Sequence, residues 1–143
     1  MECVKNIMIP HHTKIGILTG TSYGEVMRHA RAVYEPIRKR TKRKPYVRSS
    51  YFKKQKVFID LFWEHLHQKN PRDRFRRLKY FAAALEVIRE SRNHPLSSDN
   101  PHALSEILHR FAGITKEGEL FYAQVKEDKR SGRKYFISCF PAI

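Results

Sequence analysis

The C-terminal stretch 105–141 constrains the fold of this chain more than any other part of the sequence. Apolar residues recur at every second position there in three consecutive runs, and a period of two is typical of β-strands. The runs cover residues 106–112, 119–127 and 134–140. The two short segments between them contain glycine and have the length of hairpin turns. The sequence therefore predicts three antiparallel strands joined by two hairpins, a β-meander.

The same alternation sorts the side chains of these strands into two faces. On the middle strand, three apolar residues are predicted to face the core: Phe121, Ala123 and Val125. The opposite face of that strand becomes polar toward Lys126, and a ligand is expected to lie there. On the last strand, the alternation groups three residues on one face: Phe136, Ser138 and Phe140. Which faces of the outer strands join the polar face depends on the register, which the sequence does not fix.

Helical periodicity dominates the chain before residue 95. Three helices are predicted there, over residues 23–37, 50–67 and 71–91. Asn70 and Pro71 specify the start of the third helix, because asparagine caps helices and proline fits their first position. Residues 1–22 show no clear period and are interpreted as an arm, while the turn-rich connector 93–101 marks the change from helices to strands.

Helices followed by strands predict an α+β fold, in which N-terminal helices pack on one face of a small C-terminal antiparallel sheet, the meander. The chain has 143 residues, enough for one core. We divide it at residue 48. Residues 1–48 are predicted to be an N-terminal arm with a short helix and a basic run, and residues 49–143 an α+β domain of two helices and three or more strands.

Positive charge is the strongest compositional feature. The chain has 29 Lys and Arg against 14 Asp and Glu, a formal net charge of +15 at pH 7, and such a field attracts phosphate polyanions. The densest run is 38–48, inside a stretch without acidic residues between Glu35 and Asp60. We expect this run to stay flexible until a polyanion neutralises it; the alternative is a disordered basic linker without a fixed ligand.

Other partners are disfavoured by the sequence. No uninterrupted apolar span reaches about 18 residues, so no membrane partner is predicted. The two cysteines, Cys3 and Cys139, lie at opposite ends of the chain, so no disulfide framework is implied and a reducing cytoplasm is the expected compartment. None of the eight histidines has a cysteine or carboxylate partner at ligand spacing, so neither a metal nor a cofactor is predicted.

Four polar residues within apolar runs of the predicted strands are the candidate catalytic group: His109, Arg110, Lys126 and Ser138. Metal-independent RNA cleavage needs a base for the 2′-OH proton, an acid for the leaving 5′-oxygen and cations around the phosphorane. His109 titrates in the range suited to a base or an acid. Lys126 and Arg110 are predicted to hold the phosphate, with Ser138 hydrogen-bonded to it.

Eight further residues are predicted to contact the substrate, either in the strands or in the basic segments. They are Tyr122, Gln124, Arg133, Lys134, Arg43, Lys44, Arg48 and Lys53. Each candidate also has an ordinary structural interpretation. A strand histidine beside Ile and Phe is compatible with a packed core residue, and Lys126 with an edge-strand charge.

The pattern LHRFAG…GELFYAQVKED…GRKYFISCFP, preceded by helices, resembles phage and mobile-element members of the barnase–EndoU–colicin–RelE (BECR) superfamily of metal-independent ribonucleases. The resemblance covers about residues 50–141. It implies an endoribonuclease, a toxin or conflict-system effector, that cleaves tRNA or translated mRNA to a cyclic phosphate, with an antitoxin or the ribosome as possible partners. Carried over by position, it implies a site formed by His109, Arg110, Lys126 and Ser138.

Three functional hypotheses follow, with RNA favoured over DNA as the ligand. The first is the endoribonuclease. The second is a non-catalytic protein that binds nucleic acid through its Lys/Arg-rich arm and helix. The third is an inactive nuclease-fold module that binds a partner protein, which would be favoured if His109 and Lys126 were buried on opposite faces of the sheet.

Overall fold

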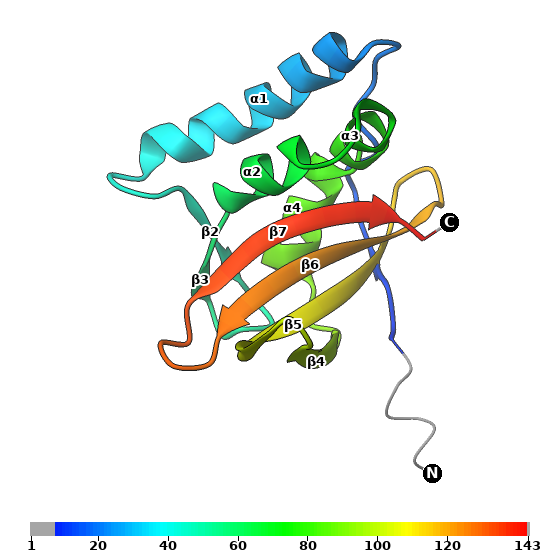
Figure 1. The fold of residues 1–143 in the computed structure, drawn as a ribbon. Helices are drawn as coiled ribbons and strands as arrows, with labels where there is room; N and C mark the ends of the chain where they lie inside the picture. Colours follow the sequence, from blue (N-terminus) through cyan, green and yellow to red (C-terminus); the bar gives the residue numbers. More distant parts are fainter. Residues whose placement is uncertain (1–7, 143) are drawn as a thin grey trace.

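The computed structural model describes residues 8–142 as four helices and one curled, seven-stranded sheet (Figure 1). The strands are β1 (His11–His12), β2 (Tyr46–Ser49), β3 (Gln55–Phe58), β4 (Leu96–Asn100), β5 (Ala103–Ile114), β6 (Leu120–Asp128) and β7 (Lys134–Pro141). The helices are α1 (Tyr23–Arg40), α2 (Leu61–His67), α3 (Pro71–Leu78) and α4 (Phe81–Glu90).

The sheet is mixed, and its strands come from both halves of the chain. Its order is β1-β5-β6-β7-β3-β2, with β4 paired to β5 beside β1. The central strands β5, β6 and β7 form the predicted antiparallel meander. In contrast, β1 runs parallel to β5 and β3 runs parallel to β7. The predicted turn-rich connector also contributes a strand, β4, which pairs antiparallel with β5.

The predicted fold class, helices on a small C-terminal antiparallel sheet, is therefore wrong. The seven-stranded sheet curls into a half-barrel, and α4 contacts both β2 and β5 from its concave side (Figure 1). The prediction failed at residues 46–58, which form the hairpin β2–β3, whereas 50–58 were predicted to begin a helix and 46–48 to belong to the basic run. The turn of this hairpin places Lys53 and Lys54 at positive φ, without the glycine or asparagine that would have revealed it. Only α2 remains of the predicted helix 50–67.

The predicted helix 71–91 is two helices, α3 and α4, with a break at Lys79 and Tyr80. The break has tertiary causes. The carbonyl of Lys79 accepts a hydrogen bond from the backbone N–H of Leu18 at 2.9 Å, and the Tyr80 ring stacks on Phe121 with centroids 5.4 Å apart. The first predicted helix is confirmed as α1, which continues through Pro36 to Arg40.

Residues 8–22, the described part of the predicted arm, pack against the domain. Glu86 of α4 is buried, and its carboxylate accepts backbone N–H bonds from Lys14, at 3.1 and 2.9 Å, and Ile15, at 3.0 Å. These bonds satisfy a carboxylate that would otherwise be costly to bury. Residues 1–7 of the predicted arm lie outside the described residues.

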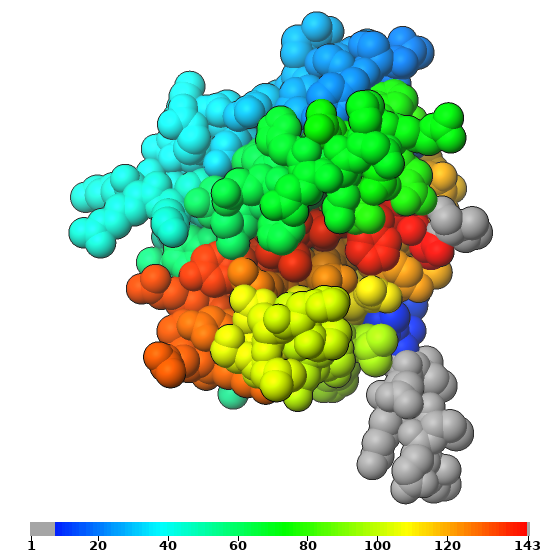
Figure 2. Space-filling view, in the orientation of Figure 1, coloured from blue at the N-terminus to red at the C-terminus, as the bar shows by residue number. Residues whose placement is uncertain are grey.

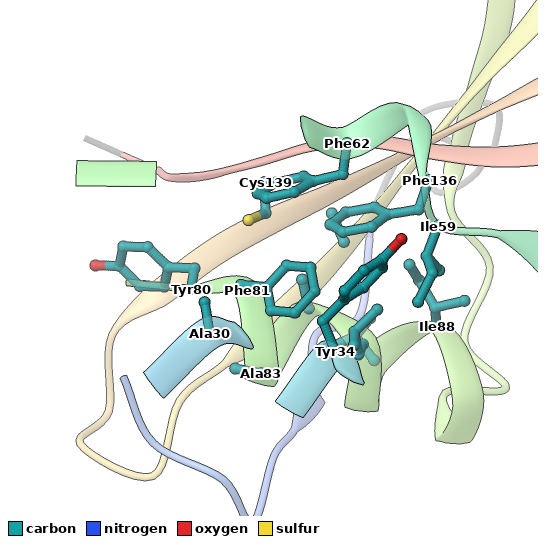
Figure 3. Close-up of a cluster of buried hydrophobic side chains, with 14 of the residues drawn as sticks. Ala30, Tyr34, Ile59, Phe62, Tyr80, Phe81, Ala83, Ile88, Phe136 and Cys139 are labelled. Atoms are coloured by element: carbon teal, nitrogen blue, oxygen red, sulfur yellow. The ribbon is translucent and has the colours of Figure 1, made fainter. Parts of the chain in front are cut away.

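One apolar core fills the concave side of the sheet (Figure 3). Phe62 of α2 stacks on Phe136 of β7, with centroids 4.9 Å apart and ring planes at 8°. Ala30 of α1, from the predicted N-terminal arm, belongs to the same buried cluster. The predicted domain boundary, residue 48, lies within strand β2. On β7, only Lys134 and Tyr135 pair with β3. Helices α2 and α3 contact β7 and cover the rest of its edge. The helices thus leave the convex face of the sheet open.

Candidate nucleic-acid interface

The convex, outer face of the sheet carries partly exposed polar and aromatic residues. On β6 the predicted alternation is confirmed: Phe121, Ala123 and Val125 are fully buried on the inner face. Tyr122, Gln124 and Lys126 alternate with them and are half-buried on the outer face. The polar face of β6 therefore faces away from α4.

A β-bulge on β7 changes the faces that alternation predicts for that strand. Gln124 pairs with Ser138 and Val125 with Phe136, so Ile137 is the extra residue. Phe136 consequently points into the core, while Ser138 and Phe140 lie on the outer face. The predicted common face of these three residues is wrong, because one inserted residue reverses the alternation beyond it.

The bulge adds Ser138 to the outer face, where regular alternation already places Arg110 and Lys126, so three of the four candidate catalytic residues share this face. Arg110 of β5 and Ser138 of β7 pair with Gln124 from its two sides, so the three side chains form a row across the central strands. Lys126 lies one outward position further along β6, opposite Tyr135. Tyr122, a predicted substrate contact, lies on the other side of the row, opposite Phe140.

Arg77 of α3 completes this cluster, and the sequence did not reveal it. Its Nη1 donates to Ser138 Oγ at 2.7 Å, and its guanidinium lies 5.1 Å from the Phe140 ring centroid. Arg110 lies 5.3 Å from the same centroid and 5.4 Å from that of Tyr122. Two guanidinium groups therefore lie against the Phe140 ring, an arrangement that can contribute two cations to a phosphate site beside the Tyr122–Phe140 pair.

Asp73 orients Arg77 toward the sheet. Its carboxylate accepts from Arg77 Nε at 3.0 Å and from Arg76 Nη2 at 3.0 Å. Burial opposes the charged form of Asp73, but the hydrogen bonds from Arg76 and Arg77 outweigh it and lower the pKa of the carboxyl. Asp73 therefore stays ionised and holds Arg77 by both charge and geometry.

Lys126 lies on the outer face of the sheet, and its charge acts on His65 of α2. Lys126 Nζ is 5.4 Å from the Tyr135 ring centroid and 3.4 Å from a Glu106 oxygen, and 23% of its side chain is exposed. Burial and then the positive charges of Lys126 and Lys69 lower the pKa of His65 in α2. Burial and the two lysine charges therefore both favour the neutral form of the His65 imidazole.

His109 lies on the opposite, inner face, and the structure does not bring it together with Arg110, Lys126 and Ser138. It pairs with Val125 and is 8% exposed. Its Nδ1 is 2.7 Å from Ser97 Oγ and its Nε2 is 2.7 Å from Glu127 Oε1. The Phe52 ring packs on the imidazole with centroids 5.0 Å apart. Both ring nitrogens thus have protein partners, as in a packed core histidine.

Lys134, a predicted substrate contact, also lies on the inner face. Its Nζ donates to Gln55 Oε1 at 2.7 Å and to the Gly132 carbonyl at 2.8 Å, and it lies 3.9 Å from Glu127. Lys53 is exposed in the β2–β3 turn, away from the outer-face cluster. These two lysines and His109 are the predicted site residues that the fold separates from the others.

The remaining predicted contacts gather around a pocket of about 720 Å³ beside β2 and β3. This basic pocket is lined by Arg40, Thr41, Lys42, Arg43, Lys44, Tyr46, Lys56, Phe58 and Arg133. Three predicted substrate contacts are among these residues: Arg43, Lys44 and Arg133. Arg48 is adjacent, with its guanidinium 5.5 Å from the Tyr46 ring centroid.

Aromatic rings connect the basic pocket to the central strands. Tyr46 packs on Phe58 at 6.2 Å between centroids, and Phe58 packs on Tyr135 at 5.7 Å. Tyr135 contacts Lys126, and the Tyr122–Phe140 pair follows at 5.7 Å. We call these five rings, with Arg48, Lys56, Lys126, Arg110 and Arg77, the outer-face track. In Figure 2 the red surface of β7 is a band between the green α2 and α3 and the yellow and orange β5 and β6.

Residues 8–142 lack two further kinds of feature. No group of three His, Cys, Asp or Glu residues in this part of the chain could hold a metal ion. No described helix is long and apolar enough to cross a bilayer. Comparison with known proteins gives no matching family, no matching curated protein and no matching solved structure.

Proposed function

We propose that this protein binds single-stranded RNA along the outer-face track and cleaves it there without a metal ion. The observation that carries the proposal is the alternation of five partly exposed aromatic rings with five basic side chains across one open sheet face. Aromatic rings stack on unpaired bases, at about 1–3 kcal/mol per base, and basic groups neutralise the phosphates between them.

The cluster around Ser138 supports the cleavage step. Arg77 and Arg110 both lie against the Phe140 ring and would hold the scissile phosphate, while Ser138, already hydrogen-bonded to Arg77, would contact one of its oxygens. The 2′-oxygen forms a bond to phosphorus, the bond to the 5′-oxygen breaks, and the cations stabilise the charge of the phosphorane between these events.

Proton transfer is assigned to His65 and Lys126 in this proposal. The lowered pKa of His65 favours its neutral form, which can accept the 2′-OH proton. The Lys126 ammonium, held by Glu106 at 3.4 Å, can donate a proton to the leaving 5′-oxygen. His109 takes no part, because its ring nitrogens are bonded to Ser97 and Glu127 on the other face. The resemblance to BECR ribonucleases adds support for the reaction but not for that residue.

A second candidate function is RNA binding without cleavage. It is favoured by the position of His109 on the inner face, since the strongest acid–base candidate of the sequence is absent from the track. Because the half-buried Lys126 lies on the opposite face, the same observation also favours the third hypothesis, an inactive nuclease-fold module that binds a partner protein. The second candidate and the first share the same interface. They differ only in whether bound RNA is cut.

The test is incubation of a 5′-labelled single-stranded RNA with the protein in EDTA, followed by gel analysis of both cleavage and binding. Arg110→Ala is compared with Arg92→Ala, which removes the same charge from an exposed residue beyond α4. We expect cleavage to cyclic-phosphate products by wild type and by Arg92→Ala, and a loss of at least about 100-fold in Arg110→Ala, as for removal of a transition-state cation.

Three outcomes separate the alternatives. Cleavage that survives in Arg110→Ala would refute the site. Intact RNA that shifts with wild type and less with Arg110→Ala would leave the binding protein and refute the nuclease. RNA that neither shifts nor is cut would refute both.

A further inference from the structure

The basic pocket carries more positive charge than one internal phosphodiester group would need to be neutralised. Six of its lining residues are basic and none is acidic: Arg40, Lys42, Arg43, Lys44, Lys56 and Arg133. An internal phosphodiester carries one negative charge, whereas a terminal phosphate monoester carries about 1.5 to 2 at pH 7. Six like charges around one pocket repel each other, so the pocket favours a ligand with concentrated negative charge.

Local structure positions three of these cations, Lys56, Arg40 and Arg133, and the adjacent Arg48. Lys56 Nζ lies 4.7 Å and the Arg48 guanidinium 5.5 Å from the ring centroid of Tyr46, so one aromatic ring positions two charges at the pocket. Arg40 ends α1, where the helix dipole favours positive charge. Arg133 approaches from the β6–β7 hairpin, far away in the sequence. The pocket is thus assembled from three separate segments of the chain.

The position of the pocket matches an end of the track. In the sheet order β2 is the last strand beyond β3, so the row of aromatic rings ends at Tyr46 and Phe58, which line the pocket. A volume of about 720 Å³ lies within the range of about 300–1,000 Å³ typical of small-molecule sites. The pocket can therefore accommodate a terminal nucleotide with its phosphate. Beyond it, the described sheet offers no further aromatic ring on which a longer RNA could stack.

We infer that the basic pocket binds the terminal phosphate of the single-stranded RNA that lies along the outer-face track. This inference rests on the proposed function and adds a specificity: the protein distinguishes phosphorylated ends from hydroxyl ends and positions RNA from that end. A 5′- and a 3′-phosphate share the required chemistry, as does the phosphate group of a free polyphosphate. The experiment separates these sources.

The test uses one short RNA sequence, 2′-O-methylated throughout to prevent cleavage, with four ends: hydroxyl at both ends, 5′-phosphate, 5′-triphosphate and 3′-phosphate. Affinities are measured by fluorescence anisotropy at one fixed salt concentration, since phosphate binding depends on salt. The Arg43→Ala/Lys44→Ala variant changes two exposed pocket residues. Its control, Arg92→Ala/Lys116→Ala, removes the same charge from exposed residues outside the pocket.

We expect at least one phosphorylated end to bind wild type about 10-fold or more tightly than the hydroxyl form. The control should keep this ratio and Arg43→Ala/Lys44→Ala should abolish it. Equal binding of all four RNAs by wild type would overturn the inference and leave the proposed function intact. Absence of binding by any of them would overturn both.

Inorganic tripolyphosphate serves as a competitor. In its presence, the apparent affinity of phosphorylated RNA should fall to that of the hydroxyl form and no further. The bases should remain bound to the track, which tripolyphosphate does not occupy. If tripolyphosphate binds wild type but a terminal phosphate gives RNA no advantage, the ligand is a free polyphosphate and the inference about RNA ends is wrong.

Discussion

Replacement of His109 separates its structural role from a catalytic one. In His109→Ala, the imidazole is removed from a site where it packs on Phe52 and bonds to Ser97 and Glu127. A neutral hydrogen bond contributes about 0.5–1.5 kcal/mol and a bond to a charged group about 1.5–3 kcal/mol. The cavity left by the ring adds to this loss. We therefore expect the free energy of unfolding to fall by about 3 kcal/mol.

Urea denaturation followed by tryptophan fluorescence measures this change, because Trp63 lies in the core. With a denaturant slope of about 2 kcal/mol/M, a loss of about 3 kcal/mol lowers the midpoint by about 1.5 M. RNA affinity and cleavage, measured in the absence of urea and corrected for the folded fraction, should stay within about threefold of wild type. Arg110→Ala should behave in the opposite way, with an unchanged midpoint and lost activity.

A conservative variant keeps this prediction falsifiable if His109→Ala does not fold. His109→Gln retains an amide that can bond to Ser97 or Glu127, and we expect it to recover part of the stability with full activity. The reasoning would be refuted if His109→Gln were as stable as wild type and bound RNA normally, yet no longer cleaved it. That result would restore His109 as the acid or base.

Three further predictions concern other buried or perturbed groups. Burial raises the pKa of the Cys139 thiol and shields it from solvent. In a Cys3→Ser variant, this thiol should therefore react with a disulfide reagent only after unfolding. Rapid labelling of the native protein at pH 8 would contradict the fold around Cys139. The pKa of His65 is lowered from its ordinary value of 6.5. If His65 is the base, the cleavage rate should rise with pH through a midpoint below 6.5. An unchanged pH–rate profile in His65→Asn would exclude His65 as the base. Glu86→Ala removes the buried acceptor of two backbone N–H groups, those of Lys14 and Ile15. It should lower the free energy of unfolding by about 3 kcal/mol, because orphaned buried donors cost about 1–3 kcal/mol each. A thermal midpoint that changes by less than about 2 °C would contradict this role.

The sequence predicted the central meander because its signals are local. The alternation of Phe121, Ala123 and Val125 identified the inner face of β6. The hairpins on either side contain Gly118 and Gly132, whose φ values of 90° and 77° are those that glycine adopts readily. Composition likewise identified the basic segment that lines the pocket.

The missed features depend on contacts between distant residues. Ser138 and Arg77 are 61 positions apart, and only the docking of α3 against β7 joins them. The break before α4 requires Leu18, and the β2–β3 hairpin requires two lysines at positive φ, which no propensity would suggest. The bulge at Ile137 moved Ser138 to the outer face, while regular alternation placed His109 on the inner one. Register thus decided the composition of the site.

The central claim is that RNA lies on the outer face of the sheet. The most direct measurement is photocrosslinking of a 2′-O-methylated oligonucleotide that contains 4-thiouridine, followed by mass spectrometry of the crosslinked peptides. We predict crosslinks to the aromatic residues of the outer-face track, above all Tyr122, Tyr135 and Phe140, and their loss on competition with unlabelled RNA. Crosslinks confined to the β2–β3 turn around Lys53, or to the segment 8–22, would contradict the account.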